Sequence, residues 1–425
     1  MNILFVVGEF PKLSQTFILN QMTGLIDAGH DVQILAKKAA PDRKVHPDVI
    51  RYRLAQRTFY YGTGRPGGKF QKTLEFAGGL VQLTLDRFIH KKGIHPNAFR
   101  DLFRYPNLIL MIRALRRIDL TDRDVILAHF GPNGILARKC LDLGLLHGRL
   151  FTAFHGYDML RYLQAKGQQA YQDLFRSQTM LLPISLFWKK RLIRLGADPS
   201  RTIVHHMGID PDKFSFCPAQ PASPVHIVSA ARFVEKKGLS FAIRAVAGLI
   251  ERGYDVRYRI AGDGPLHAQL QQQIADLGLE DHVFLAGWKT QDEWIDMMRE
   301  AQMVLAPSIT ADDGDMEGIP VQLMEAMAMG KIVVSTLHSG IPELIQSGVN
   351  GYLVPEKDPD SLTETMASAL KSPDLWPDLA GKARQTVADQ FQIRRQNSQL
   401  ICLLSGEPMK KKMPDGRLQA PPEAQ

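Results

Sequence analysis

An apolar segment, EGIPVQLMEAMAMG, runs from Glu317 to Gly330 and contains two carboxylates. Glu317 is its first residue, and Glu325 lies in its interior. Pro320 suits the first turn of a helix, because its φ angle is fixed and its missing N–H would have no partner there. Gly330 is a typical residue to end that helix. The free N–H groups of the first turn can bind an anion. Glu325, about two turns further along, needs a polar partner such as a sugar hydroxyl if it is buried.

Two cations stand near another predicted helix start in the second half of the chain. Arg232 and Lys237 lie in RFVEKKG, just after a strand that ends at Ala230. An arginine fork and a lysine ammonium can together hold a diphosphate. With the anion site beside Glu317, they could neutralise a leaving nucleotide diphosphate.

Glycine-containing loops follow two further predicted strands. Gly262 and Gly264 belong to the loop GDGP, and Gly287 precedes Trp288. Such loops can place backbone groups against a nucleotide base, although ordinary turn chemistry explains each of them equally well. The sequence leaves both interpretations open.

Two histidines stand at strand ends in the first half of the chain. His129 precedes Phe130, and His155 opens the motif HGYD. Ligands of open α/β sheets bind outside the carboxyl ends of the strands, which makes His155 a candidate catalytic residue. A single histidine is more often structural.

The acidic loop TADDGDMEG could be mistaken for a metal site. Asp312, Asp313 and Asp315 lie close together in it, but acidic loops of this kind are often only solvated. We predict no metal site there. The three cysteines are far apart and lack metal-ligand or disulfide spacing.

Short apolar runs typical of buried parallel strands alternate with helical segments in both halves of the chain. The pattern predicts an α/β protein with two doubly wound, Rossmann-like domains that face each other across a cleft. We expect a first domain at 1–207, a proline-rich linker at 208–224, a second domain at 225–390, a helix at 391–407 that returns to the first domain, and a disordered tail at 408–425. The expected strands are 2–7, 31–36, 125–129, 150–154, 180–184 and 202–205, then 225–230, 257–261, 283–285, 303–306, 332–335 and 352–354.

Positive charge gathers in one part of the first domain. Residues 37–117 hold 18 Lys and Arg against 5 Asp and Glu, a surplus of 13 in a chain whose net charge is +8. We expect a basic helical insertion at about 58–117, with helices near 69–90 and 98–117. It could touch an anionic membrane surface or simply pack on its domain. No nucleic-acid reader motif accompanies the charge, so we expect no nucleic-acid partner.

Taken together, these motifs resemble the retaining glycosyltransferases of family 4, which have the GT-B architecture. The resemblance is carried by Arg232 with Lys237, by the GDGP loop, and by Glu317 with Glu325. It continues through HGYD and through GIDPDKF at 208–214, and so spans nearly the whole chain. The segments EFPKLSQTF and TADDGDMEGIPVQLMEAMA are similar to the bacterial colanic-acid and exopolysaccharide glycosyltransferases.

The resemblance implies roles for individual residues. Glu317 would contact the donor sugar, Glu325 the ribose, and His155 the reacting sugar from the first domain. The implied donor site consists of Arg232, Lys237, Gly262, Gly264, Trp288, Gly318, Ile319, Pro320 and Glu325. The chain lacks the Gly-Gly turn that many members carry after the first strand, and FPKLSQ takes its place. Ser14, Thr16 and Asp158 are candidate contacts to acceptor or phosphate.

The implied activity is transfer with retention from a UDP- or GDP-sugar to a lipid-linked oligosaccharide, without a metal and with no cofactor besides the nucleotide sugar. No apolar run reaches the length of a membrane span, so we expect a cytoplasmic protein, peripheral at the inner face of the membrane. Two other classes remain open. A nucleotide-sugar epimerase would need no acceptor, and a non-catalytic binding component would not turn over donor.

Overall fold

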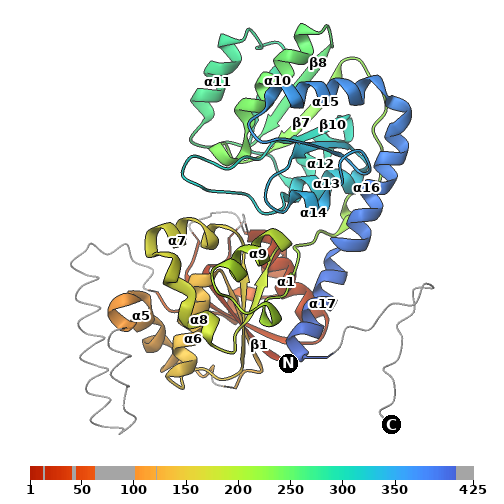
Figure 1. Cartoon of the computed structure of the whole chain (residues 1–425). Helices are drawn as coiled ribbons and strands as arrows, with labels where there is room; N and C mark the ends of the chain where they lie inside the picture. The colour runs from red at the N-terminus through yellow and green to blue at the C-terminus, as the bar shows by residue number, and fades with distance from the viewer. Residues whose placement is uncertain (13–14, 41–44, 63–100, 121, 408–425) are drawn as a thin grey trace.

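The computed structural model describes residues 1–12, 15–40, 45–62, 101–120 and 122–407. The predicted helix at 69–90, most of the basic insertion, and the tail at 408–425 lie outside the described residues. Figure 1 shows two domains, with the N-terminal one below and the C-terminal one above. Among the described residues, no helix is long and apolar enough to cross a bilayer.

The N-terminal domain contains a parallel six-stranded sheet in the order β3-β2-β1-β4-β5-β6. Its central strands β1 and β4 are neighbours although they are far apart in the chain, which creates the switch point of a doubly wound sheet. The strands are β1 Asn2–Glu9, β2 Asp31–Lys38, β3 Thr58–Tyr60, β4 Val125–His129, β5 Arg149–Phe154 and β6 Met180–Pro183. The helices are α1 Thr16–Asp27, α2 Pro47–Arg51, α5 Pro106–Leu115, α6 Gly131–Asp142, α7 Arg161–Lys166, α8 Gln172–Arg176 and α9 Leu186–Arg194.

The C-terminal domain repeats the same topology, in the order β12-β11-β10-β7-β8-β9, with β7 and β10 adjacent at the centre. The strands are β7 Val225–Ala230, β8 Val256–Ala261, β9 Val283–Gly287, β10 Met303–Ala306, β11 Ile332–Thr336 and β12 Tyr352–Val354. The helices are α10 Leu239–Glu251, α11 His267–Asp276, α12 Gln291–Glu300, α13 Val321–Met329, α14 Ile341–Leu344, α15 Pro359–Lys371 and α16 Trp376–Gln390. The prediction of two doubly wound α/β domains is confirmed.

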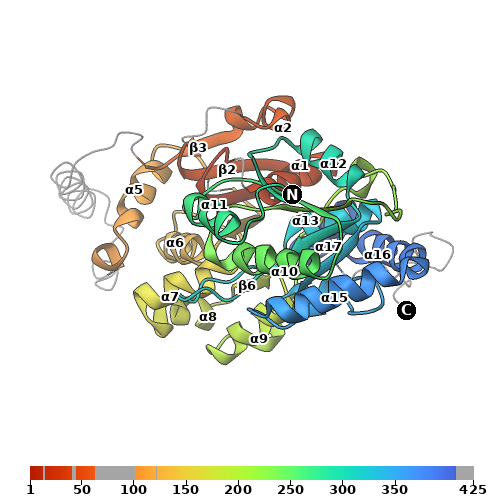
Figure 2. The same cartoon turned by 90° about the horizontal axis from the view of Figure 1, so that it is seen from above.

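The central strands of each sheet are buried on both faces, and their successive side chains point to opposite sides of the sheet. In β1, Leu4 packs into one core cluster, whereas Ile3 and Phe5 pack into another. In β10, Met303 and Val304 divide in the same way. Figure 2 shows α10 and α15 side by side over one face of the C-terminal domain. The two-sided burial explains why the strands are nearly continuous apolar runs.

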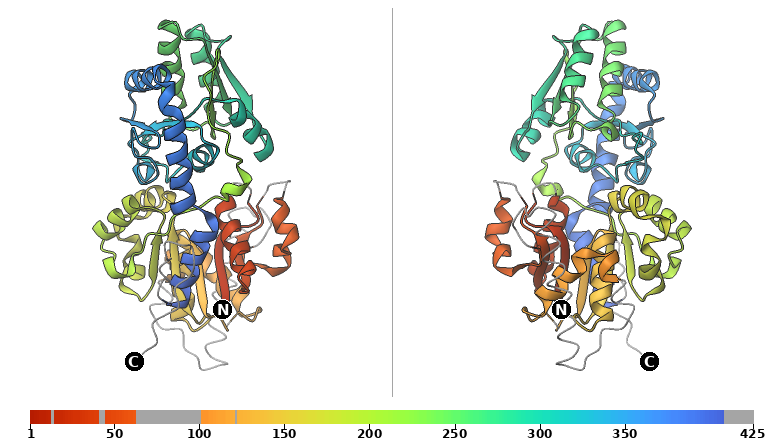
Figure 3. Two further views of the ribbon diagram at one scale, coloured as in Figure 1. Left: turned by 90° about the vertical axis from the view of Figure 1, so that its right-hand side faces the viewer. Right: turned by 90° about the vertical axis from the view of Figure 1, so that its left-hand side faces the viewer.

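The chain returns to the N-terminal domain at its end. After α16, the helix α17 (Ile393–Ser405) packs against α1, and Leu400 and Leu404 are fully buried in the same core cluster as the α1 side chains. Figure 3 shows this crossing along one side of the molecule. At the crossing, Ile209 and Phe391 share a backbone hydrogen bond of 2.9 Å, so the outgoing and returning segments run together.

Three local predictions are wrong. Residues 58–60 form the edge strand β3 instead of opening the helical insertion. Residues 202–205 make only an isolated bridge to Leu181, because Pro183 has no N–H to continue the ladder. The helix expected at 98–117 breaks at Tyr105, since Pro106 cannot donate a helical hydrogen bond and begins α5 instead.

The burial of α17 predicts that Leu400→Ala lowers the free energy of unfolding of the N-terminal domain by about 2–5 kcal/mol, the range for large-to-small core substitutions. Urea unfolding followed by circular dichroism measures the effect. Arg395→Ala, which changes an exposed residue of the same helix, is the control and should change stability by less than about 0.5 kcal/mol. Equal effects of the two substitutions would contradict the packing of α17.

Candidate active site

The candidate site is built on the two central strands of the C-terminal sheet. The loops that follow β7 and β10 both leave from the carboxyl ends of these strands, at the switch point where α/β sheets bind ligands. They are joined by a hydrogen bond of 2.9 Å from the Ile309 N–H to the Lys236 carbonyl oxygen. Gly238 permits this approach, because its φ is +63° and a Cβ there would lie 1.8 Å from the Pro307 carbonyl oxygen.

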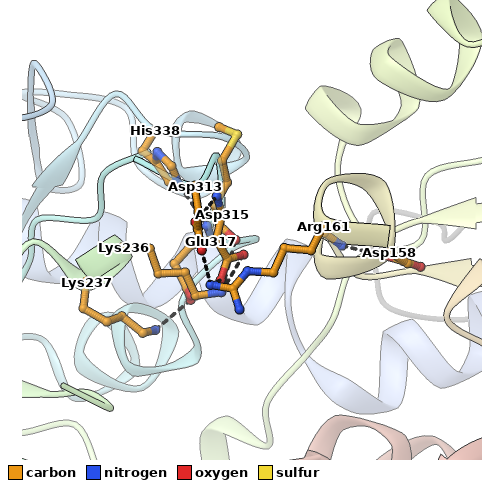
Figure 4. Close-up of polar contacts among 10 residues, drawn as sticks. Asp158, Arg161, Lys236, Lys237, Asp313, Asp315, Glu317 and His338 are labelled. Atoms are coloured by element: carbon orange, nitrogen blue, oxygen red, sulfur yellow. Dashed lines mark hydrogen bonds and ion pairs between the residues drawn. The ribbon is translucent and has the colours of Figure 1, made fainter. Parts of the chain in front are cut away.

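The side chain of Glu317 sits between two lysines, as Figure 4 shows. Its Oε1 lies 3.0 Å from Nζ of Lys236, and its Oε2 lies 2.7 Å from Nζ of Lys237. Burial disfavours the charged carboxylate, but attraction to Lys237 and then Lys236 outweighs burial and lowers the pKa of Glu317 to about 2. Glu317 is therefore ionised throughout the neutral range.

The backbone of Glu317 is held from the opposite side by a buried histidine. Its N–H donates to Nε2 of His338 over 3.0 Å, and Nδ1 of His338 lies 2.6 Å from Oε1 of Glu356. The Thr310 N–H donates to the same Glu356 carboxylate over 2.6 Å. The loop between Thr310 and Glu317 is thereby bonded to Glu356 near both ends, directly at Thr310 and through His338 at Glu317. These bonds fix the backbone position of Glu317.

Glu325 lies on α13 and faces a cavity of about 840 Å³ between the domains. Nε1 of Trp294 donates to Oε2 of Glu325 over 2.9 Å. Burial raises the pKa of Glu325 to about 7, against the opposing effect of the Trp294 hydrogen bond. The side chain can therefore both donate and accept hydrogen bonds near neutral pH. Thr16 and Val321 line the same cavity.

Arg232 and Trp288 are exposed on the loops after β7 and β9. Within the described ranges, no side chain forms an ion pair with Arg232, in contrast to Lys237 beside Glu317. Trp288 is 68% exposed, which is unusual for so large an apolar side chain. Both side chains are accessible to a ligand.

The GDGP glycines are explained by loop packing. A Cβ on Gly262 would lie 1.8 Å from the Ala231 carbonyl oxygen, and one on Gly264 would lie 2.7 Å from that of Phe233. Both residues also have positive φ. Their role as contacts to a nucleotide base stays a prediction.

The start of α13 lies against the N-terminal domain. A Cβ on Gly318 would lie 2.5 Å from Cδ1 of Ile184 and 4.0 Å from the His155 carbonyl oxygen. Ile319 is buried, and Pro320 is the N-cap residue, one position before the predicted first turn. No side chain caps the first turn, and its Leu323 N–H donates to the Pro320 carbonyl oxygen over 3.1 Å, so an anion would bind at the N–H groups before Leu323. Gly330 ends the helix with φ +77°, in agreement with the prediction.

His155 belongs to a pair of stacked histidines in the N-terminal domain. Its Nε2 lies 3.0 Å from Nδ1 of His129. Burial, and then the neighbouring His205, lower the pKa of His155 to about 3, so the ring is neutral at pH 7. His155 can therefore accept or donate a hydrogen bond, but it brings no positive charge to the cleft.

Asp158 does not reach the cleft, and its candidate role as an acceptor or phosphate contact is corrected. The side chain is fully buried, and its carboxylate accepts the N–H groups of Gly131 at 2.9 Å, His155 at 3.0 Å and Gly156 at 3.0 Å. Burial raises the pKa of Asp158 to about 6 despite these bonds. Asp158 therefore shapes the loop that carries His155.

The loop that contains Ser14 leads into α1. Gln15 is the N-cap of α1 and makes no side-chain capping bond. Ser14 itself lies outside the described residues. Thr16 is the first residue of the helix and lines the 840 Å³ cavity, so it remains a candidate contact.

The acidic loop is neutralised by cations. Asp312 lies 3.4 Å from Nζ of Lys357, while Asp315 lies 3.4 Å from Nζ of Lys236. Asp313 pairs with Arg161, which reaches across from α7 of the N-terminal domain. Among the described residues, no group of three or more His, Cys, Asp or Glu is placed to hold a metal ion.

Two further residues belong to this site and were not predicted from the sequence, Lys236 and Arg161. Lys236 stands directly beside Lys237, and adjacent lysines give no sign that both converge on one carboxylate. Arg161 follows HGYD by only two residues, Met159 and Leu160, and this spacing was the available signal.

Comparisons with known proteins agree with this architecture. Residues 14–213 match the family "Glycosyltransferase Family 4", and residues 212–386 match "Glycosyl transferases group 1". The putative colanic acid biosynthesis glycosyltransferase WcaL of Escherichia coli is 40% identical over 95% of this chain and 99% of its own. The amylovoran biosynthesis glycosyltransferase AmsK of Erwinia amylovora is 41% identical over 85% of this chain and 89% of its own.

The fold is also that of a solved glycosyltransferase from Rickettsia africae, which superposes with a TM-score of 0.66 at 14% identity, over 96% of this chain and 99% of its own. HepE of Anabaena, crystallised with UDP, superposes with a TM-score of 0.70 at 18% identity, over 96% of this chain and all of its own. The chain therefore belongs to the glycosyltransferases with the GT-B fold. Within them it is a member of the family 4 group that includes WcaL and AmsK.

The environment of Glu325 predicts how stability depends on pH. Because the native pKa of about 7 lies above the ordinary value of 4.5, the native state holds a proton that the unfolded state has lost. Wild-type stability should fall relative to Glu325→Gln as the pH rises from 4.5 to 7, and the difference should level off above that. Melting temperatures of both proteins across this range measure it, and parallel profiles would contradict the raised pKa.

Proposed function

We propose that the chain transfers a sugar, with retention at the anomeric carbon, from a UDP- or GDP-sugar to a lipid-linked oligosaccharide in exopolysaccharide biosynthesis. The observation that carries the proposal is the ionised Glu317 beside the uncapped start of α13, with Glu325 facing the cavity on the same helix. The names of WcaL and AmsK, which refer to colanic acid and amylovoran biosynthesis, support the polymer class. The UDP bound in HepE supports a nucleotide donor.

In this proposal the diphosphate lies between the exposed Arg232 and the start of α13. Lys237 turns from Glu317 to a phosphate oxygen, while Lys236 stays with Glu317 and keeps it ionised. Arg232, Lys237 and the helix N–H groups then stabilise the charge that grows on the leaving diphosphate. These cations supply what a metal would otherwise provide, so the proposed transfer is metal-independent and uses no cofactor.

The chemical step follows from the retained configuration. The acceptor hydroxyl attacks the anomeric carbon on the face from which the diphosphate departs, the bond from carbon to phosphate oxygen breaks, and the acceptor proton passes to a phosphate oxygen of the donor. Glu317 orients the donor sugar through hydrogen bonds to its hydroxyl groups. The neutral His155 faces the same sugar from the other domain, and Glu325 binds the ribose hydroxyls.

The proposed location is the inner face of the cytoplasmic membrane, where a lipid-linked acceptor is available. Its support is the basic segment at 37–117, much of which lies outside the described residues. Attraction of such a segment to anionic lipid would fall with salt.

Glu317→Gln should lower turnover by at least about 100-fold, because it removes a charged group that orients the reacting sugar. The measurement is release of nucleotide diphosphate with and without acceptor, which also separates a transferase from an epimerase or a binding protein. Glu364→Gln, at an exposed ion pair with Arg252, is the control and should keep wild-type turnover. Near-normal turnover of the folded Glu317→Gln protein would contradict the proposed role of Glu317.

Nucleotide binding can be tested without an acceptor. UDP, GDP, ADP and their sugar conjugates are compared for their effect on melting temperature, since a ligand at 100 times its Kd stabilises the native state by about 2.7 kcal/mol. One nucleotide family should stabilise the wild type, and Arg232→Ala should lose the shift. Arg252→Ala should keep it. Stabilisation that survives in Arg232→Ala would remove that residue from the diphosphate site.

A further inference from the structure

A chain of alternating charges crosses the cleft and ends on Glu317. Nη2 of Arg161 lies 3.5 Å from Oδ2 of Asp315, whose Oδ1 lies 3.4 Å from Nζ of Lys236. Nζ of Lys236 lies 3.0 Å from Oε1 of Glu317, and Nζ of Lys237 lies 2.7 Å from Oε2 of Glu317. Figure 4 shows Arg161 entering from α7, while the other members belong to the C-terminal domain.

The charges in this network balance only when the domains are together. The C-terminal domain contributes three carboxylates, on Asp313, Asp315 and Glu317, but only the two cations of Lys236 and Lys237. Arg161 supplies the third cation from the N-terminal domain. Without it, the acidic loop would carry one uncompensated negative charge.

Lys236 is the member that this imbalance would disturb. It is shared between Asp315 and Glu317, and Asp315 is only 6% exposed, so the carboxylate of Asp315 cannot rely on water. Arg161 neutralises Asp315 from the far side, which leaves Lys236 free to approach Glu317 more closely than Asp315. Removing Arg161 would pull Lys236 toward Asp315 and loosen Glu317.

The position of Arg161 is itself well defined. Asp158, two residues before Leu160, is anchored by three backbone N–H groups, and α7 begins directly afterwards. Gln164, on the next turn of the same helix, donates to the Asp313 carbonyl oxygen over 2.9 Å. Two side chains of α7, those of Arg161 and Gln164, thus contact the acidic loop.

We propose that Arg161 is a positioning residue that acts through Asp315 and Lys236 to set the Glu317 carboxylate when the cleft is closed. The proposal rests on the role given to Glu317 above. It makes closure of the domains a condition for an oriented Glu317.

The test compares Arg161→Met, Asp315→Asn and the double variant. Hydrogen exchange followed by mass spectrometry should show faster exchange of the backbone at 309–317 in Arg161→Met, because the loop loses its cross-cleft anchor. With donor and acceptor, kcat of Arg161→Met should fall about tenfold while KM for the donor stays within about twofold, as expected for misplacement of an orienting group. Asp315→Asn should keep kcat within about twofold of wild type, and the double variant should recover most of the kcat lost in Arg161→Met, because an amide at position 315 no longer draws Lys236 away from Glu317.

Two matched controls distinguish an effect through Lys236 from a general loosening of the contact between the domains. Asp313→Asn removes the exposed partner of Arg161 but keeps an oxygen for the Asp315 N–H. Glu343→Gln weakens a separate contact between the domains, in which Glu343 accepts the Leu186 N–H over 2.8 Å. Both controls should change kcat less than Arg161→Met.

The proposal is overturned if Glu343→Gln matches Arg161→Met, if Asp315→Asn does not restore kcat in the Arg161→Met background, or if exchange at 309–317 does not change in Arg161→Met. The exchange measurement needs no turnover. It therefore decides the positioning role even if the proposed transferase reaction itself is wrong.

Discussion

A buried carboxylate can stay ionised only where cations offset the water it has lost, and Glu317 meets this condition through two lysines at 2.7 and 3.0 Å. The surrounding structure follows from this requirement. The lysines lie on the loop after β7 and Glu317 on the loop after β10, so the two strands must be neighbours. Gly238 must be a glycine for the loops to meet, and His338 must hold the Glu317 backbone from the far side.

The two domains meet through polar contacts as well as through packing. Glu343 of α14 accepts the N–H groups of Leu186 and Phe187 at the start of α9, and Nε2 of His206 lies 3.0 Å from the same carboxylate. A carboxylate at a helix N-terminus is favoured by the helix dipole and by the free donors there. The C-terminal domain thus caps a helix of the N-terminal domain. Conversely, Arg161 of the N-terminal domain forms ion pairs with Asp313 and Asp315 of the C-terminal domain. Together these contacts define how the cleft closes.

Much of the fold could be predicted because its strands are buried on both faces and therefore read as apolar runs. The failures came where a single backbone group decided the outcome, such as the missing N–H of Pro183 or Pro106. In the site, Glu317 and Lys237 could be predicted because they stand close to the starts of recognisable helices, and Glu325 because it is a carboxylate inside an apolar helix. Lys236, Arg161 and Glu343 could not, since their partners lie 81, 154 and 157 residues away and no local pattern records the contact. Asp158 was misjudged for a related reason: a carboxylate in a polar motif suggests a ligand contact, whereas its backbone partners are visible only in the fold.

The return of α17 to the first domain has a consequence for how the protein is made. The core of the N-terminal domain includes Leu400 and Leu404, which are among the last residues of the described chain to leave the ribosome. Although N-terminal domains generally fold first during synthesis, this one cannot complete its core until the second domain has also been synthesised. The apolar cluster that Leu400 and Leu404 complete is therefore left partly uncovered throughout translation of the second domain, and during that time it is a natural contact for a chaperone.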